Sequence, residues 1–247
     1  MTSLLISILL LVGVSLIGAH FAAEPPDRSF LYRLVVAAWC VLMPLTAIVN
    51  YWMPFSSGGD DESYYFLASL PVYSFWDLLD TKRFVGLMEQ PGYPMALSFI
   101  NFIVGSNLLV FKLFNLAVLV FLGLVWYRIG VVLEDRGFGK MASVVVMTLT
   151  PLRFYIFILR KDLLIALIQS VFLYGAIGAQ DKPGVLRYWL YMVCSTLAVI
   201  LFRTPLVLVH LAVLWCAYIF RQWAAEQSKA KTLLLSLVGL AFAAVFL

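Results

Sequence analysis

The chain has 247 residues, of which 64% are hydrophobic and only 12% are charged, and its formal net charge is +4. A soluble domain carries about 25% charged residues, so a water-soluble fold of this length could not bury so much apolar surface. The apolar residues form near-continuous runs rather than the short alternating segments of a membrane β-barrel. Because only helices and closed barrels satisfy their backbone hydrogen bonds in lipid, the sequence predicts an all-α, polytopic transmembrane bundle. The small positive charge fits loops that orient a membrane protein, and we expect no nucleic-acid partner.

About eight membrane spans are predicted, most of them near the roughly 20 residues that cross a bilayer. The first run is interpreted as a span rather than as a signal peptide, because no basic segment precedes it and no clear cleavage site follows it. The predicted spans are residues 3–22, 31–52, 108–132, 138–152, 160–180, 188–203, 205–220 and 232–247. We expect residues 1–247 to form a single membrane domain.

Residues 94–104 are also apolar, but this run has only 11 residues. At 1.5 Å rise per residue it reaches about 17 Å, whereas the hydrocarbon core is about 30 Å thick. We therefore predict an interfacial or re-entrant helix at this position. Lys112, in the span that follows, is interpreted as a snorkelling side chain or as a contact to an anionic headgroup.

The distribution of basic residues predicts how the chain is oriented. If the N-terminus is outside and residues 94–104 do not cross, ten of the 17 Lys and Arg residues fall on the cytoplasmic side, as the positive-inside rule requires. They are Arg28, Arg33, Arg128, Arg136, Lys140, Lys182, Arg187, Arg221, Lys229 and Lys231. The N-terminus and the long loop after the second span are then extracytoplasmic. The expected location is the inner (cytoplasmic) membrane of a bacterial cell.

This long loop, residues 53–107, is predicted to be acidic and to carry short amphipathic helices on the outer membrane face. Its three consecutive carboxylates, those of Asp60, Asp61 and Glu62, precede a pair of tyrosines. A carboxylate here can act as a general base on a sugar hydroxyl, or bind a divalent cation such as Mg²⁺ or Mn²⁺. Asp60 and Asp61 are the candidate metal ligands, although the pattern requires no cofactor. A solvated acidic loop is the alternative.

A second polar group is mainly basic. Arg160, Lys161 and Asp162 stand between two apolar stretches, where three charges are costly unless they face the interface or a polar cavity. Because arginine forms paired hydrogen bonds with phosphate oxygens, we predict an anion site. A snorkelling ion pair at the membrane boundary is the alternative. Arg153 and Arg203 fall on the same predicted external face.

Several motifs in residues 30–205 resemble those of one known group of enzymes. They lie at residues 60–65, 90–94, 104–107, 111–115, 149–151 and 160–164. They run from the Asp-Asp-Glu-x-Tyr-Tyr segment, through a proline-tyrosine turn and a short helix, to a basic motif that opens a membrane helix. In this order they resemble the type C (GT-C) superfamily of polyprenyl-phosphate-dependent glycosyltransferases and the polysaccharide polymerases of the Wzy and EpsG kind. The two spans before the acidic loop favour the polymerase branch.

The resemblance implies a sugar donor linked to a polyprenyl phosphate or diphosphate, an acceptor that is a glycan or a lipid, and binding to membrane lipids. Asp60 or Asp61 would deprotonate the acceptor hydroxyl, and Glu62 would position it. The expected substrate-binding residues are Arg160, Lys161, Asp162, Arg203, Arg153, Lys82, Arg83, Gln90 and Tyr93.

Two other functions stay open at this point. A transporter or lipid flippase would also place charges at membrane depth, but it predicts broken helices and internal repeats, and no convincing repeat is visible. A non-catalytic subunit of an envelope-glycan assembly complex would explain why the chain is short for the enzyme family, and it would imply partner subunits.

Overall fold

The computed structural model describes residues 2–54, 60–70, 77, 91–133, 135–149, 155–157, 159–182 and 184–214. Across these residues the regular elements are helices and none is a strand, which confirms the predicted all-α class. The chain divides into two compact units, residues 1–202 and 203–247. In the second unit the described residues are 203–214, of which 206–214 form a helix.

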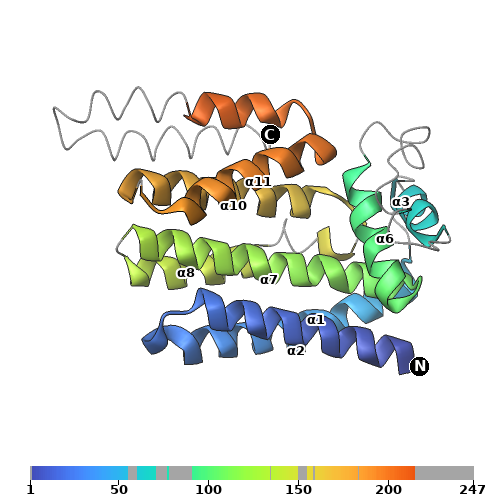
Figure 1. Cartoon of the computed structure of the whole chain (residues 1–247). Coiled ribbons are helices and arrows are strands. Elements are labelled where there is room, and N and C mark those ends of the chain that lie inside the picture. The colour runs from blue at the N-terminus through green and yellow to red at the C-terminus, as the bar shows by residue number, and fades with distance from the viewer. Residues whose placement is uncertain are drawn as a thin grey trace. The chain divides into compact units, whose positions relative to one another are not determined.

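Long helices that run along one common direction make up most of the first unit (Figure 1). They are α1 (Thr2–Ala22), α2 (Arg28–Trp52), α7 (Leu108–Val132), α8 (Arg136–Thr148), α10 (Asp162–Asp181) and α11 (Leu186–Phe202). A short 3₁₀ helix, η1 (Pro25–Asp27), joins α1 to α2. Two further helices, α3 (Asp60–Ser69) and α6 (Gly92–Val104), follow α2. In Figure 1, α6 lies across the ends of the long helices rather than along them.

The centre of the unit is α7, which packs against α1, α2, α8 and α10. Most of its side chains are buried. Its apolar residues continue around the whole helix, which is typical of a helix with neighbours on every side. The hydrophobic core accordingly combines residues of α7 with residues of the helices that surround it.

Four helices are long and apolar enough to cross a membrane. They are Leu4–Ala22, Pro25–Trp52, Leu108–Val132 and Asp162–Asp181, and they agree with four of the predicted spans. α8 and α11 are shorter, with 13 and 17 residues. At 1.5 Å per residue α8 is about 20 Å long, less than the roughly 30 Å core. The total of eight spans stays a prediction, and residues 215–247 lie outside the described residues.

The helix predicted at 138–152 ends earlier than expected. α8 ends at Thr148, and Leu149 already has an extended backbone with ψ of 119°. Pro151 follows two residues later, and a proline disfavours helical backbone in the residue before it. A helix is found where one was predicted at 94–104, since α6 spans Gly92–Val104; its interfacial or re-entrant placement stays a prediction. α6 ends at Gly105, whose φ of +86° suits a residue without a Cβ.

Side-chain caps start α7 and α8. The Asn107 side chain accepts a hydrogen bond from the Leu109 amide at 2.9 Å, and the Asp135 side chain accepts one from the Phe138 amide at 2.7 Å. Such caps satisfy amides that have no partner inside the helix. Both helices therefore begin directly after a short polar side chain.

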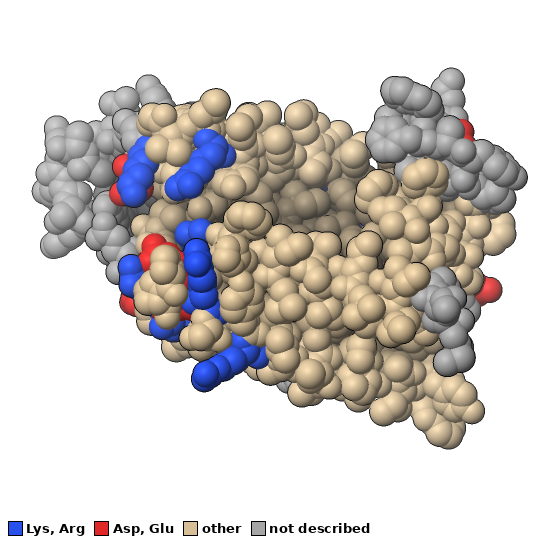
Figure 2. Space-filling view, turned by 60° about the horizontal axis from the view of Figure 1, so that its bottom comes forward, with Lys and Arg blue, Asp and Glu red and all other residues tan. Residues whose placement is uncertain are grey.

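Charged residues gather at the end of the first unit where α1 meets α2, α7 meets α8 and α10 meets α11 (Figure 2). We call this the basic end, and we call the opposite end, which holds α3 and α6, the loop end. Arg28, Arg33, Arg128, Arg136, Lys140, Lys182 and Arg187 all lie at the basic end. These are the described members of the set predicted to be cytoplasmic. They share one end of the unit, and the orientation of that end in a bilayer stays a prediction.

Ion pairs and hydrogen bonds join the helix connections at the basic end. Arg136 pairs with Glu24 and Lys140 pairs with Asp27, each at 2.5 Å. The hydroxyl of Tyr127 donates to the second carboxylate oxygen of Asp27 at 2.8 Å. Because Asp27 is buried, these partners offset the cost of removing its charge from water. The α1–α2 connection is thereby fixed to α7 and α8.

α7 and α8 also cross closely at this end. A Cβ added at Gly139 would lie 2.7 Å from the carbonyl oxygen of Tyr127, and one added at Gly130 would lie 2.5 Å from the amide nitrogen of Gly139. Glycine pairs allow helix backbones to approach in this way. The crossing therefore leaves no room for a larger residue at either glycine.

Candidate functional site

The predicted acidic residues lie at the start of α3. Asp60 is the first residue of the helix, and Glu62 is exposed in its first turn. The side chains of Asp60 and Asp61 lie outside the described residues. α3 packs against α6 at the loop end of the first unit. Among the described residues no group of His, Cys, Asp and Glu is spaced to hold a metal ion.

Tyr93 joins α3, α6 and α7. This side chain is fully buried in α6, and its ring meets the Tyr64 ring of α3 edge to face, with 5.0 Å between the ring centroids. Its hydroxyl donates a hydrogen bond to the side-chain oxygen of Asn115 in α7 at 2.9 Å. The sequence predicted Tyr93 as a substrate-binding residue, and in the structure it makes internal contacts.

Asn115 continues this chain of contacts toward the predicted basic residues. Its amide nitrogen donates to the carbonyl oxygen of Tyr155 at 3.1 Å, and Tyr155 lies five residues before Arg160. We call the contacts from Tyr64 through Tyr93 and Asn115 to Tyr155 the polar link. It connects the acidic helix with the segment that leads into α10.

Lys112 is the residue at this end that the sequence interpretation got wrong. Its side chain is 0% exposed, so it does not snorkel. The ammonium group donates to the carbonyl oxygens of Pro54 at 2.7 Å and Met53 at 3.3 Å. Those carbonyls follow the end of α2 and open the acidic loop. Lys112 and Asn115 are three residues apart and share a face of α7. This one face therefore contacts both the start of the acidic loop and the polar link.

The basic segment opens α10. Lys161 is the N-cap residue and Asp162 the first helical residue, so the Asp162 carboxylate lies where a helix N-terminus favours negative charge. Arg160 and Lys161 are both half-buried. Because α10 meets α11 at the basic end, the start of α10 lies at the loop end. The acidic helix α3 lies at the same end of the first unit.

The structure does not place the remaining predicted site residues relative to these segments. Arg203 belongs to the second unit, where its side chain is exposed. Lys82, Arg83, Gln90 and Arg153 lie outside the described residues.

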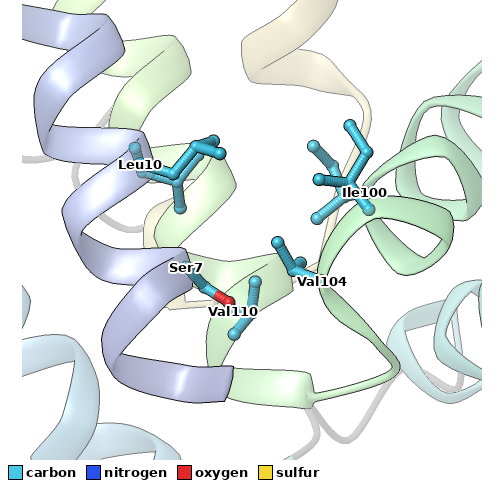
Figure 3. Close-up of a pocket in the computed structure, with 7 residues that line it drawn as sticks. Ser7, Leu10, Ile100, Val104 and Val110 are labelled. Carbon is cyan, nitrogen blue, oxygen red and sulfur yellow. The ribbon is translucent and has the colours of Figure 1, made fainter. Parts of the chain in front are cut away.

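A small apolar cavity lies at the loop end between α1, α6 and α7 (Figure 3). Its lining is Ser7, Leu10, Leu11, Ile100, Ile103, Val104 and Val110. Its volume is about 20 Å³, little more than one water-sized sphere. It can take a methyl group, and it is too small for a sugar or a phosphate.

Comparison of the chain with protein-family models, with curated proteins and with solved structures finds no match. The resemblance to polyprenyl-phosphate-dependent enzymes therefore rests on the sequence motifs alone.

Proposed function

We propose that this chain is a membrane glycosyltransferase or polysaccharide polymerase that uses a polyprenyl-(di)phosphate-linked sugar at the extracytoplasmic face. The polar link is the observation that carries the proposal. It ties the helix that begins at Asp60 to the segment before Arg160. General-base and phosphate-binding groups then belong to one framework, as transfer from a lipid phosphate requires.

In the proposed reaction the acceptor hydroxyl attacks the anomeric carbon of the donor sugar. Asp60 or Asp61 takes the hydroxyl proton, while Glu62 positions the acceptor or shares a divalent cation. The bond between the sugar and the phosphate oxygen breaks, and the electron pair leaves with the phosphate. Arg160 and Lys161 stabilise the negative charge that grows on this leaving group.

Apolar side chains at the loop end support access by a lipid-linked donor. Tyr51 and Trp52 are more than three-quarters exposed at the end of α2, and Phe99 and Phe102 are nearly half exposed on α6. Aromatic residues are enriched where a membrane meets water. A donor anchored in the outer leaflet would then reach α3 by lateral diffusion, without leaving the bilayer.

The test is glycan transfer in proteoliposomes that contain a polyprenyl-diphosphate sugar and an acceptor. Loss of the general base in an Asp60→Asn, Asp61→Asn double variant should lower the rate by about 10²–10⁴-fold. Arg160→Gln should lower it about tenfold or more, because it removes a charged hydrogen-bond donor. Asp181→Asn and Arg33→Gln make the same changes at exposed positions of the basic end and should keep normal rates.

Normal transfer by both the acidic double variant and Arg160→Gln would refute the proposal. Movement of the lipid-linked sugar across the membrane without formation of a glycosidic bond would favour a flippase instead.

A further inference from the structure

The helix α8 ends beside the middle of α7 rather than at the loop end. It starts at Arg136, at the basic end, and runs back along α7 (Figure 1). Its last turn reaches the level of Gly123, because a Cβ added at that glycine would lie 2.5 Å from the Cε atom of Met147. Gly123 is about 22 Å from the start of α7 and about 14 Å from its end along the helix axis. Helical structure in α8 therefore stops at a level that α7 places deep inside the bundle.

A second helical piece continues along α7 after this break. Residues 155–157 are helical again, and the Asn115 side chain donates to the carbonyl oxygen of Tyr155 at 3.1 Å. Asn115 lies eight residues before Gly123 in α7. Tyr155 lies the same number of residues after Met147. The two pieces thus follow α7 from the basic end toward the loop end as one interrupted span.

The break follows from the proline at position 151. In a continued helix the amide of that residue would donate to the Met147 carbonyl oxygen, four residues earlier, but Pro151 has no amide hydrogen. The Leu149 amide still donates to the carbonyl oxygen of Val145 at 2.8 Å. The last carbonyl oxygens of a helix have no partner inside it. Those of α8 therefore need hydrogen-bond donors from outside the helix.

The surroundings of the break decide which donor is available. Lipid tails offer none, so irregular backbone at membrane depth must be covered by protein or lie against water. Thr148 and Leu149 are both exposed, and Leu149 is 44% exposed. α7 is long and apolar enough to cross a membrane. The exposed end of α8 beside it thus requires water near the middle of the bilayer.

The loop end is the side from which water reaches this break. Toward the basic end α7 and α8 cross too closely, because a Cβ added at Gly139 would lie 2.7 Å from the Tyr127 carbonyl oxygen. Toward the loop end the span is irregular, and Asn115 brings a polar side chain to it. Arg160 and Lys161, both half-buried, follow at the start of α10. Polar groups therefore accompany the span from the break to the loop end.

We propose that the break between α8 and residues 155–157 borders an aqueous recess, which reaches from the loop end to about the middle of the bilayer. The carbonyl oxygens at the end of α8 accept hydrogen bonds there, so the recess takes water and other hydroxyl-bearing molecules. This inference goes beyond the proposed glycosyl transfer and does not depend on it. Access to the recess is measured without any sugar donor.

The test is the reactivity of single cysteines in the full-length chain in membrane vesicles, after the native cysteines are replaced by serine. Leu149→Cys places a thiol at the break. Val41→Cys is the matched control, because Val41 is 63% exposed and lies as far from the start of α2 as Leu149 lies from the start of α8. A charged, impermeant methanethiosulfonate should modify Leu149→Cys about tenfold faster than Val41→Cys, or more, because apolar surroundings suppress the reactive thiolate. Both thiols should react equally in denaturant.

Glu62→Cys and Gly184→Cys mark the two ends of the bundle in vesicles of either orientation. Leu149→Cys should be modified in those vesicles in which Glu62→Cys is modified. Thr148→Cys repeats the measurement if Leu149→Cys does not fold. Modification of the folded variant as slowly as Val41→Cys would overturn the proposal, since lipid or protein would then cover the break. Modification from the side of Gly184→Cys would also overturn it, and access from both sides would indicate a path through the membrane, as in a transporter.

Discussion

At the scale of single residues, Lys112 shows why a cation is buried in an apolar helix. A buried charge is costly unless hydrogen bonds compensate it. The carbonyl oxygens of Met53 and Pro54 accept from its ammonium group. Lys112 thereby fixes the first residues of the acidic loop to α7, which is the most buried helix of the unit.

Replacing Lys112 with methionine should loosen the start of the loop. The substitution keeps the length of the side chain but leaves two carbonyl acceptors without their donor, which costs about 1–3 kcal/mol. We expect a lower melting temperature in detergent and faster proteolytic cleavage within residues 53–91. Lys182→Met removes an exposed lysine at the basic end and serves as the control. Unchanged melting and cleavage in Lys112→Met would show that Lys112 does not hold the loop.

At the scale of helices and their connections, the polar link predicts mechanical coupling between α3 and the start of α10. Asn115→Leu removes both the acceptor for Tyr93 and the donor to Tyr155. Spin labels at Ser63 and Lys161, in a chain whose cysteines are replaced by serine, would report the distance between the two segments. We expect a narrow distribution in the parent protein and a broader one in Asn115→Leu.

Tyr93→Phe is the milder comparison for this measurement, because it keeps the ring packing against Tyr64 and removes one hydrogen bond. The width of its distance distribution should lie between those of the parent protein and of Asn115→Leu. If Asn115→Leu gives the same narrow distribution as the parent, the two segments are held by other contacts.

The sequence predicted a helix well where one apolar run is bounded by polar residues at both ends. α7 was predicted at 108–132 and is found at Leu108–Val132, because a polar cap and a charged turn bound one apolar run. The sequence also predicted the short helix α6, and it predicted that the basic residues of the helix connections lie at one end of the bundle. The polar link and the Lys112 contacts were not, because they join residues that are 22 to 59 positions apart. Nothing in local spacing indicates which carbonyl or amide such a side chain will meet.

At the scale of the whole molecule, the separation of charge between the two ends predicts a single orientation in the membrane. Single cysteines at Ser57 and Glu62 should react with an impermeant thiol reagent from outside. Cysteines at Gly137 and Gly184 should react only after permeabilisation. The native cysteines are first replaced by serine, because Cys40 and Cys194 are exposed in the structure. Labelling of Glu62 from the cytoplasm would place the acidic helix on the wrong side for a donor in the outer leaflet.

The contacts that hold α1 at the basic end have a geometric consequence for its other end. Ion pairs, the Gly130–Gly139 crossing and the hydrogen bond from Arg128 to the Phe21 carbonyl oxygen all hold the helices together at the basic end. α1 has 21 residues, and at 1.5 Å per residue its length is about 31 Å. A tilt of about 5° around the fastened end would therefore move its other end by about 3 Å. That end lines the small apolar cavity with Ser7 and Leu10. A tilt of this size would enlarge that cavity, which in the structure has room for little more than a methyl group.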